Sequence, residues 1–155
     1  MNKYCKMLNK LWLNALIMVL FASLFAILFV WKYGTMSYIS GKWILYYGIV
    51  AMAAMICCLF LGNNSMAKKI KKLREEDLQQ KLIGYKAVYN KKLKFFSAIS
   101  LVAIISMILL NNLFYAIFAA LSLLLIIVSR AMPFKVKYEL NLSEEDTKRI
   151  DKIKL

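Results

Sequence analysis

Apolar and charged residues are sharply separated along this chain. Three stretches contain no Asp, Glu, Lys or Arg, namely residues 11–31, 43–67 and 95–129. A charge-free run of about 20 mostly apolar residues has the length that a helix needs to cross a lipid bilayer. The first two stretches therefore predict one membrane-spanning helix each, at 11–31 and 43–62.

The third stretch is too long for one crossing, and Asn111 and Asn112 interrupt it at its middle. We expect two short helices, 95–110 and 113–129, that form a hairpin. The two Asn side chains suit its turn because amides bond to water and to each other. Each helix is near the lower length limit for a crossing, so a re-entrant hairpin is the alternative.

The connector 63–94 carries an apolar stripe at helical spacing, in which residues recur three or four positions apart. The stripe consists of Leu78, Leu82, Tyr85, Tyr89 and Leu93, and it continues to Phe96. It predicts that the third membrane helix projects out of the membrane, or that a separate amphipathic helix bends into it near Gly84. The stripe is a candidate docking surface for a cytoplasmic protein partner. The alternative is a helix on the membrane surface whose lysines contact headgroups.

The tail 130–155 follows Pro133, which cannot continue the fourth helix. Residues 135–140 alternate between polar and apolar types, which predicts an extended segment. The fold class that follows is all-α. It is a four-helix transmembrane bundle in a single domain, 1–155, with a cytoplasmic amphipathic helix between the second and third helices.

A short helix is expected near the end of the tail. Ser143 and Asp146 have the spacing of a capping box, with Ser143 as the N-cap and Asp146 reaching back. Ile150 and Ile153 then fall on one side of the helix.

Positive charge is distributed unequally between the two ends of the predicted helices. The net charge is +14, and of the 22 Lys and Arg only Lys32 and Lys42 lie between the first two apolar stretches. The positive-inside rule therefore predicts that both termini and the connector 63–94 are cytoplasmic. All eight carboxylates lie on the same side.

Anionic lipid headgroups attract such a surface, by about 1 kcal/mol for each well-placed Lys or Arg. We therefore expect membrane lipids as partners and no nucleic acid. The candidate headgroup contacts are Lys68, Lys69, Lys71, Lys72 and Arg74.

Residue types needed for common catalytic sites are missing. The chain has three Cys and no His, which excludes bis-His haem, most catalytic zinc sites and His-based acid–base chemistry. Adjacent Cys57 and Cys58 point about 100° apart on a helix, so they cannot ligate one metal together. The apolar stretches hold no ionisable group except Tyr, whereas transporters usually place one near the midplane. We expect no enzyme activity, no catalytic residue, no metal site and no cofactor.

Small residues recur at four-residue spacing on three of the predicted helices, which lets helix backbones approach closely in a membrane. Packing within one chain and self-association into a homo-oligomer are both consistent with this pattern. The candidates are Ala22, Ala26, Ala53, Cys57, Ala116 and Ala120.

Two segments carry a resemblance to a known family. They are Lys81-Leu-Ile-Gly-Tyr-Lys-Ala-Val-Tyr89 and the ending from Pro133 through Glu139-Leu-Asn-Leu-Ser-Glu-Glu145, on either side of the apolar hairpin. Over residues 68–147 the chain resembles a family of small four-helix inner-membrane proteins of Bacteroidota. That family closes its last helix with Arg-Pro, where this chain departs with Arg130-Ala-Met-Pro133. The resemblance implies a multi-pass bacterial inner-membrane protein and no particular activity.

These observations favour a non-enzymatic inner-membrane subunit or scaffold that docks a protein or anionic lipid through its basic cytoplasmic face. One alternative is an immunity protein that neutralises a membrane-targeting toxin, since small helical proteins without catalytic groups suit that task. A channel or transporter would need a polar path, and the sequence offers only scattered Ser and Asn.

Overall fold

The computed structural model describes residues 1–33, 42–110 and 112–150, and it is helical wherever the described chain has regular structure. Asn111 and Ile153, for which the sequence makes predictions, lie outside the described residues. The elements, in chain order, are α1 (Asn2–Tyr33), α2 (Lys42–Leu73), α3 (Leu78–Leu110), the 3-10 helix η1 (Leu113–Tyr115), α4 (Ala116–Val128), α5 (Pro133–Leu140) and α6 (Glu144–Ile150).

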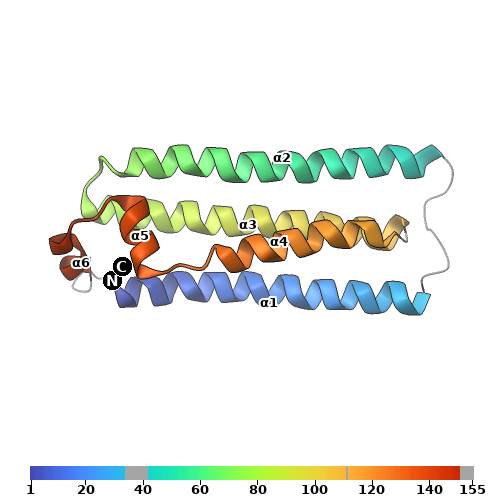
Figure 1. Cartoon of the computed structure of the whole chain (residues 1–155), viewed down its shortest axis with the longest axis horizontal. Coiled ribbons are helices and arrows are strands. Elements are labelled where there is room, and N and C mark those ends of the chain that lie inside the picture. The colour runs from blue at the N-terminus through green and yellow to red at the C-terminus, as the bar shows by residue number, and fades with distance from the viewer. Residues whose placement is uncertain (34–41, 111, 151–155) are drawn as a thin grey trace.

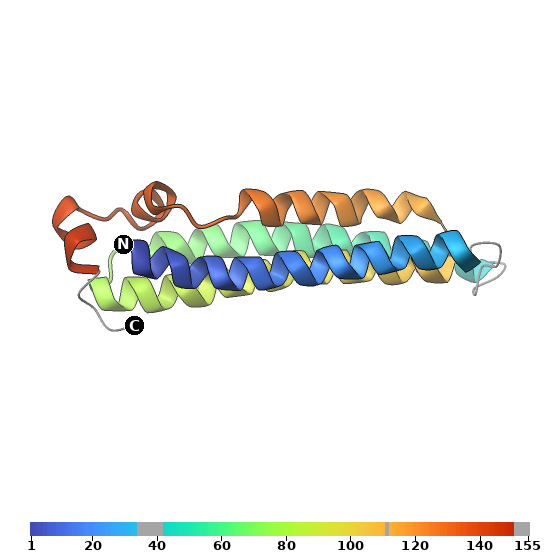
Figure 2. The ribbon, with the colours of Figure 1, turned by 90° about the horizontal axis from the view of Figure 1, so that it is seen from below.

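Helix α3 lies at the centre of the structure. It packs against α1, α2 and α4, whereas α1 and α2 lie on opposite sides of it (Figure 1). Helix α4 forms a separate layer (Figure 2) and also contacts α1. Among the described residues, no extended contact joins α2 to α1 or to α4. The arrangement is therefore a unit of α1, α3 and α4 with α2 added at one side of α3, a looser assembly than the expected four-helix bundle.

Three helices, α1, α2 and α3, are long and apolar enough to cross a membrane. Only 11% of the most apolar window of α1 and 17% of that of α2 is buried, against 56% for α3. Helices α1 and α2 thus expose most of their apolar surface, as expected of helices that face lipid. The expected fourth crossing, 113–129, consists of η1 and the 13-residue α4. Together with α5, from which it is bent by 86°, α4 would form a fourth, broken span.

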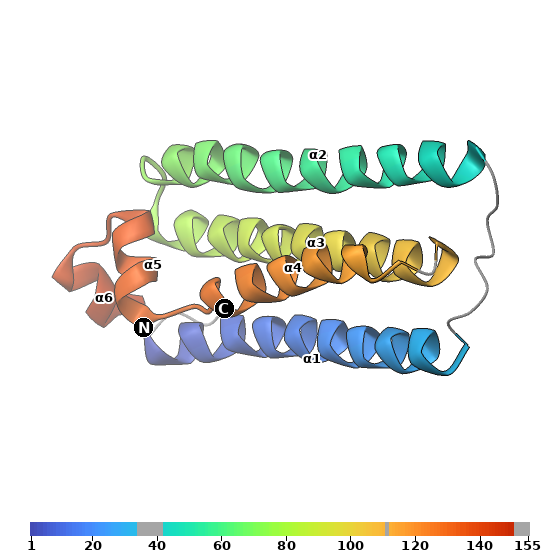
Figure 3. The ribbon, with the colours of Figure 1, turned by 45° about the vertical axis from the view of Figure 1, so that its right-hand side comes forward.

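The connector between the second and third helices is shorter than expected. Helix α2 continues to Leu73 and α3 begins at Leu78, so only a four-residue turn separates them (Figure 3). Since α3 is one unbroken helix, the continuation of the third helix ahead of residue 95 is confirmed, and the separate amphipathic helix bending near Gly84 is wrong.

The tail differs from its prediction in one segment and agrees in another. The predicted extended conformation of residues 135–140 is wrong, because these residues belong to α5. This helix begins at Pro133, where the fixed φ of proline suits the first turn. Val136 and Leu140, four residues apart, are its buried positions.

The capping box of α6 is confirmed. The Asp146 N–H donates to Ser143 Oγ, and the Ser143 N–H donates to Asp146 Oδ2, both at 3.1 Å. At the other end of the molecule, Asn112 Oδ1 accepts the Phe114 N–H at 2.9 Å and so helps to start η1.

Replacing Gly84 by alanine tests the packing of α2 on α3. A Cβ atom at this position would collide with Cδ2 of the buried Leu73, so we expect overpacking to outweigh the gain in helix propensity of about 1 kcal/mol. The free energy of unfolding, measured in detergent, should fall, and Leu73→Ala in the Gly84→Ala background should recover part of the loss. A Gly84→Ala variant more stable than wild type would contradict this packing.

Candidate functional site at the basic end

One end of the structure collects the segments that hold most of the positive charge. The start of α1, the turn between α2 and α3, and helices α5 and α6 lie together there (Figure 1). The predicted headgroup contacts Lys68, Lys69, Lys71 and Lys72 are exposed on the last turns of α2. The fifth, Arg74, is also exposed, but its Nε donates to the backbone oxygen of Glu139 at 2.9 Å and so links α2 to α5.

The predicted docking stripe is buried inside the protein. Leu82, Tyr85, Tyr89 and Leu93 are each at most 5% exposed, and Leu78 is half-buried. The stripe fails as a docking surface because the N-terminus of the same chain and its α4–α5 segment already cover it. The helical periodicity identified an apolar face correctly but not the segments that cover it.

Three tyrosine hydroxyls hold these covering segments onto α3. Tyr4 donates to the Leu82 carbonyl at 2.7 Å, Tyr85 to Glu139 Oε2 at 2.5 Å, and Tyr89 to the Ser129 carbonyl at 2.9 Å. Burial raises the pKa of all three hydroxyls, and for Tyr85 the hydrogen bond to Glu139 raises the pKa further. They therefore remain neutral donors at physiological pH.

Side chains from several elements donate hydrogen bonds to backbone carbonyls at the end of α4, where partners within the helix run out. Trp12 Nε1 donates to the Ile126 carbonyl at 2.7 Å, and Lys135 Nζ donates to the Val128 carbonyl at 3.1 Å. The guanidinium of Arg130 lies 5.5 Å from the centre of the Trp12 ring, a cation–π contact. The end of α4 is thus fixed relative to α1 and α5.

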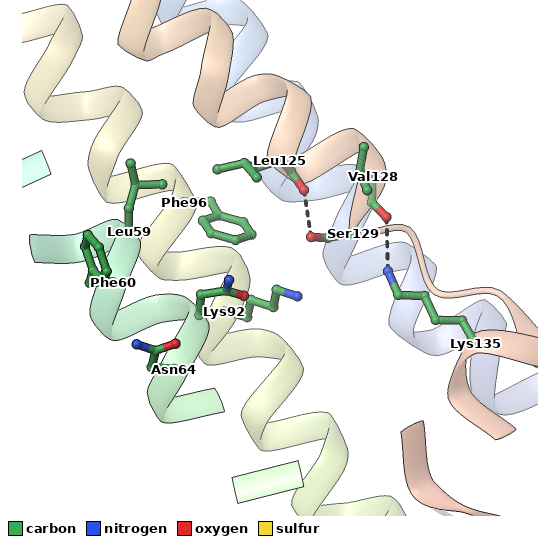
Figure 4. Close-up of a pocket in the computed structure, with 10 residues that line it drawn as sticks. Leu59, Phe60, Asn64, Lys92, Phe96, Leu125, Val128, Ser129 and Lys135 are labelled. Carbon is green, nitrogen blue, oxygen red and sulfur yellow. Dashed lines mark hydrogen bonds between the residues drawn. The ribbon is translucent and has the colours of Figure 1, made fainter. Parts of the chain in front are cut away.

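A cavity of about 430 Å³ opens between α2 and α4, and residues of α3 also line it (Figure 4). Its apolar lining comes from Leu59, Phe60, Phe96, Leu125 and Val128. Its polar lining comes from Asn63, Asn64, Lys92, Ser129 and Lys135. The cavity therefore combines an apolar wall with amide, hydroxyl and ammonium groups, and no carboxylate lines it.

Lys92 is the central charged group of this region. Its ammonium lies 5.8 Å from the Phe96 ring, and none of the described carboxylates forms an ion pair with it. Burial lowers the pKa of Lys92, and the nearby charge of Lys135 lowers it further, while Glu139 acts in the opposite direction. A second cavity, of about 350 Å³, shares Lys92 and is also lined by Arg74 and Glu139.

Sequence analysis missed Lys92, Lys135 and Asn63 as site residues. A signal was present, because Asn63 follows the predicted second crossing and Lys92 precedes the third by three positions. Both positions correspond to one membrane interface in the predicted topology, so polar groups there could have been paired.

The predicted small-residue contacts are divided between buried and exposed positions. Ala26 is fully buried, while Ala22 and Ala116 are half-buried. Ala53, Cys57 and Ala120 are exposed, so they do not pack within the protein, and self-association through them stays a prediction.

The basic end supplies ammonium, amide and hydroxyl groups beside apolar side chains. Among the described residues, no group of three or more His, Cys, Asp or Glu side chains could hold a metal ion. What the basic end presents instead is a set of fixed cations and amides beside apolar surface, which suits an amphipathic anion.

No protein-family model, curated protein or solved structure matches this chain. The resemblance to inner-membrane proteins of Bacteroidota therefore stays a prediction.

Proposed function

We propose that this protein is a non-enzymatic component of a bacterial inner membrane whose basic cytoplasmic end binds anionic phospholipid. In this proposal α1, α2, α3 and the η1–α4 segment each cross the bilayer, with α3 and α4 forming a hairpin, and both termini are cytoplasmic. The alternative of an immunity protein and that of a channel stay predictions, because no contact described above favours either.

The change of surface along α2 is the observation that supports this proposal most. Phe60 and Leu61 are exposed apolar residues, and the exposed cations Lys68 and Lys69 follow Leu61 by seven and eight positions. At 1.5 Å per residue this separation is about 10–12 Å along the helix. The polar headgroup region of one leaflet is about 5–7 Å deep, so this separation is long enough to cross it. Lysines at this height would contact lipid phosphates while the apolar residues remain among the acyl chains.

Binding of anionic and zwitterionic lipids to the full chain tests the proposal. Phosphatidylglycerol and phosphatidylcholine would each be titrated into detergent-solubilised protein, and the bound lipids counted by native mass spectrometry. We expect tighter binding of phosphatidylglycerol and a loss of the preference at high salt. Lys68→Gln with Lys69→Gln should weaken binding by up to roughly 30-fold, from about 1 kcal/mol per lysine.

The matched control is Lys32→Gln with Lys42→Gln, which removes the same charge from exposed positions at the other end of the molecule. It should leave phosphatidylglycerol binding unchanged. Equal binding of the two lipids by the wild type, or equal losses in the two double variants, would contradict the proposal.

A further inference from the structure

The cavity lies between α2 and α4, beside the part of α3 on which α2 packs. Helix α2 packs on α3 and, near its end, on α5, but not extensively on α4 among the described residues. Leu59 of α2 and Leu125 of α4 therefore form opposite walls, and Phe96 of α3 contributes to the lining between them (Figure 4). If these helices cross a bilayer, an apolar groove between two of them would face the lipid chains.

The polar part of the cavity carries positive charge. Lys92 and Lys135 contribute two ammonium groups to one cavity, and Asn63 contributes an amide. The described carboxylate near them, Glu139, lines two adjoining pockets, one of which it shares with both Lys92 and Lys135, and it already accepts a hydrogen bond from Tyr85. Two like charges beside a cavity without a carboxylate favour an anion between them.

The position of the cations fits the depth of a headgroup. Lys92 precedes by three residues the charge-free stretch that begins at residue 95, and Asn63 follows the apolar part of α2. A phosphate held there would have its acyl chains beside Phe60 and Val128, which are both largely exposed. The cavity volume of about 430 Å³ is within the range of small-molecule sites.

We propose that this cavity is a specific site for the headgroup of one anionic phospholipid, held by Lys92 and Lys135 with its acyl chains lying between α2 and α4. This inference rests on the proposed function and adds a single defined site to it. The general basic surface attracts many lipids weakly, whereas this cavity would retain one.

The test is the dissociation constant for the first phosphatidylglycerol bound by the full chain, measured by native mass spectrometry. Lys92→Gln should raise this constant at least tenfold, and Lys92→Arg should keep it within threefold of wild type. The control Lys94→Gln removes an exposed charge from the same helix and should leave the constant unchanged. Unfolding midpoints without lipid confirm that each variant is folded, which we expect because Lys92→Gln removes a half-buried charge.

The outcomes separate the two proposals. A wild type that binds phosphatidylglycerol and phosphatidylcholine equally would overturn both proposals. A preference for phosphatidylglycerol with equal constants for Lys92→Gln and Lys94→Gln would overturn the cavity site alone. A third arm adds inorganic phosphate, and complete displacement of the first lipid by millimolar phosphate would show a site for the free anion and overturn the lipid assignment.

Discussion

Replacing Leu82 by alanine is expected to lower the free energy of unfolding by about 2–5 kcal/mol, the range for truncating a fully buried leucine. Leu82 has no exposed surface, and its backbone carbonyl accepts the hydrogen bond from Tyr4 that holds the start of α1 onto α3. The loss should appear in unfolding curves recorded in detergent. It should also appear as faster proteolysis of the N-terminal turns, since α1 is the element packed there.

Ile83→Ala is the matched control, because the neighbouring side chain is 55% exposed on the same helix. We expect its free energy of unfolding to change by less than about 0.5 kcal/mol. Similar stabilities for the two variants would mean that α3 does not bury the face described here, and would restore the stripe as a docking surface.

Alkaline pH should destabilise the basic end through its three buried tyrosines. Their pKa values are raised in the folded protein above the ordinary value of 10.0. Above pH 10 the unfolded chain therefore loses these protons while the folded chain keeps them, so stability is complete below pH 10 and falls as pH rises. Each tyrosine contributes about 1.4 kcal/mol per pH unit. Together they should lower the free energy of unfolding by ~4 kcal/mol between pH 9 and pH 11.

Tyrosine-to-phenylalanine variants identify the source of this pH dependence. Tyr85→Phe should flatten the slope above pH 10 by about one third, although the lost hydrogen bond to Glu139 also lowers stability at neutral pH. Tyr138→Phe, which removes an exposed tyrosine, is the control. The lowered pKa of Lys92 has the opposite effect, because it makes the free energy of unfolding rise with pH, but it is one group against the three tyrosines. A slope that Tyr85→Phe leaves unchanged would contradict this assignment.

Local sequence signals predicted local structure well. The charge-free stretches predicted the long apolar helices, because an apolar run of about 20 residues is typical of a membrane-spanning helix. The stripe from Leu78 to Phe96 predicted a helix that continues into the third apolar stretch, and α3 confirms it. The capping box at Ser143 is confirmed because both of its hydrogen bonds lie within four residues.

Contacts between distant segments were not predictable in the same way. The stripe identifies an apolar face, but its cover comes from Tyr4 and from the α4–α5 segment, far away along the chain. Over residues 43–62 of α2 nearly every position is apolar, so the pattern has no contrast that marks the inward face. The face that α2 buries includes Gly48, Ala51 and Met55 rather than Ala53 and Cys57. The Lys92 cavity was missed for the same reason, since α2, α3, α4 and α5 all contribute to its lining.

The described residues of α1 and α2 make no extended contact with each other, and this bears on the order of assembly. If the protein is the membrane protein proposed above, a chain made from its N-terminus delivers these two helices to the bilayer first, without a large shared surface in their described parts by which to associate. They would remain as separate helices until α3 is synthesised and enters between them. Since α3 buries the most surface of the three, its arrival would convert independent helices into a folded protein.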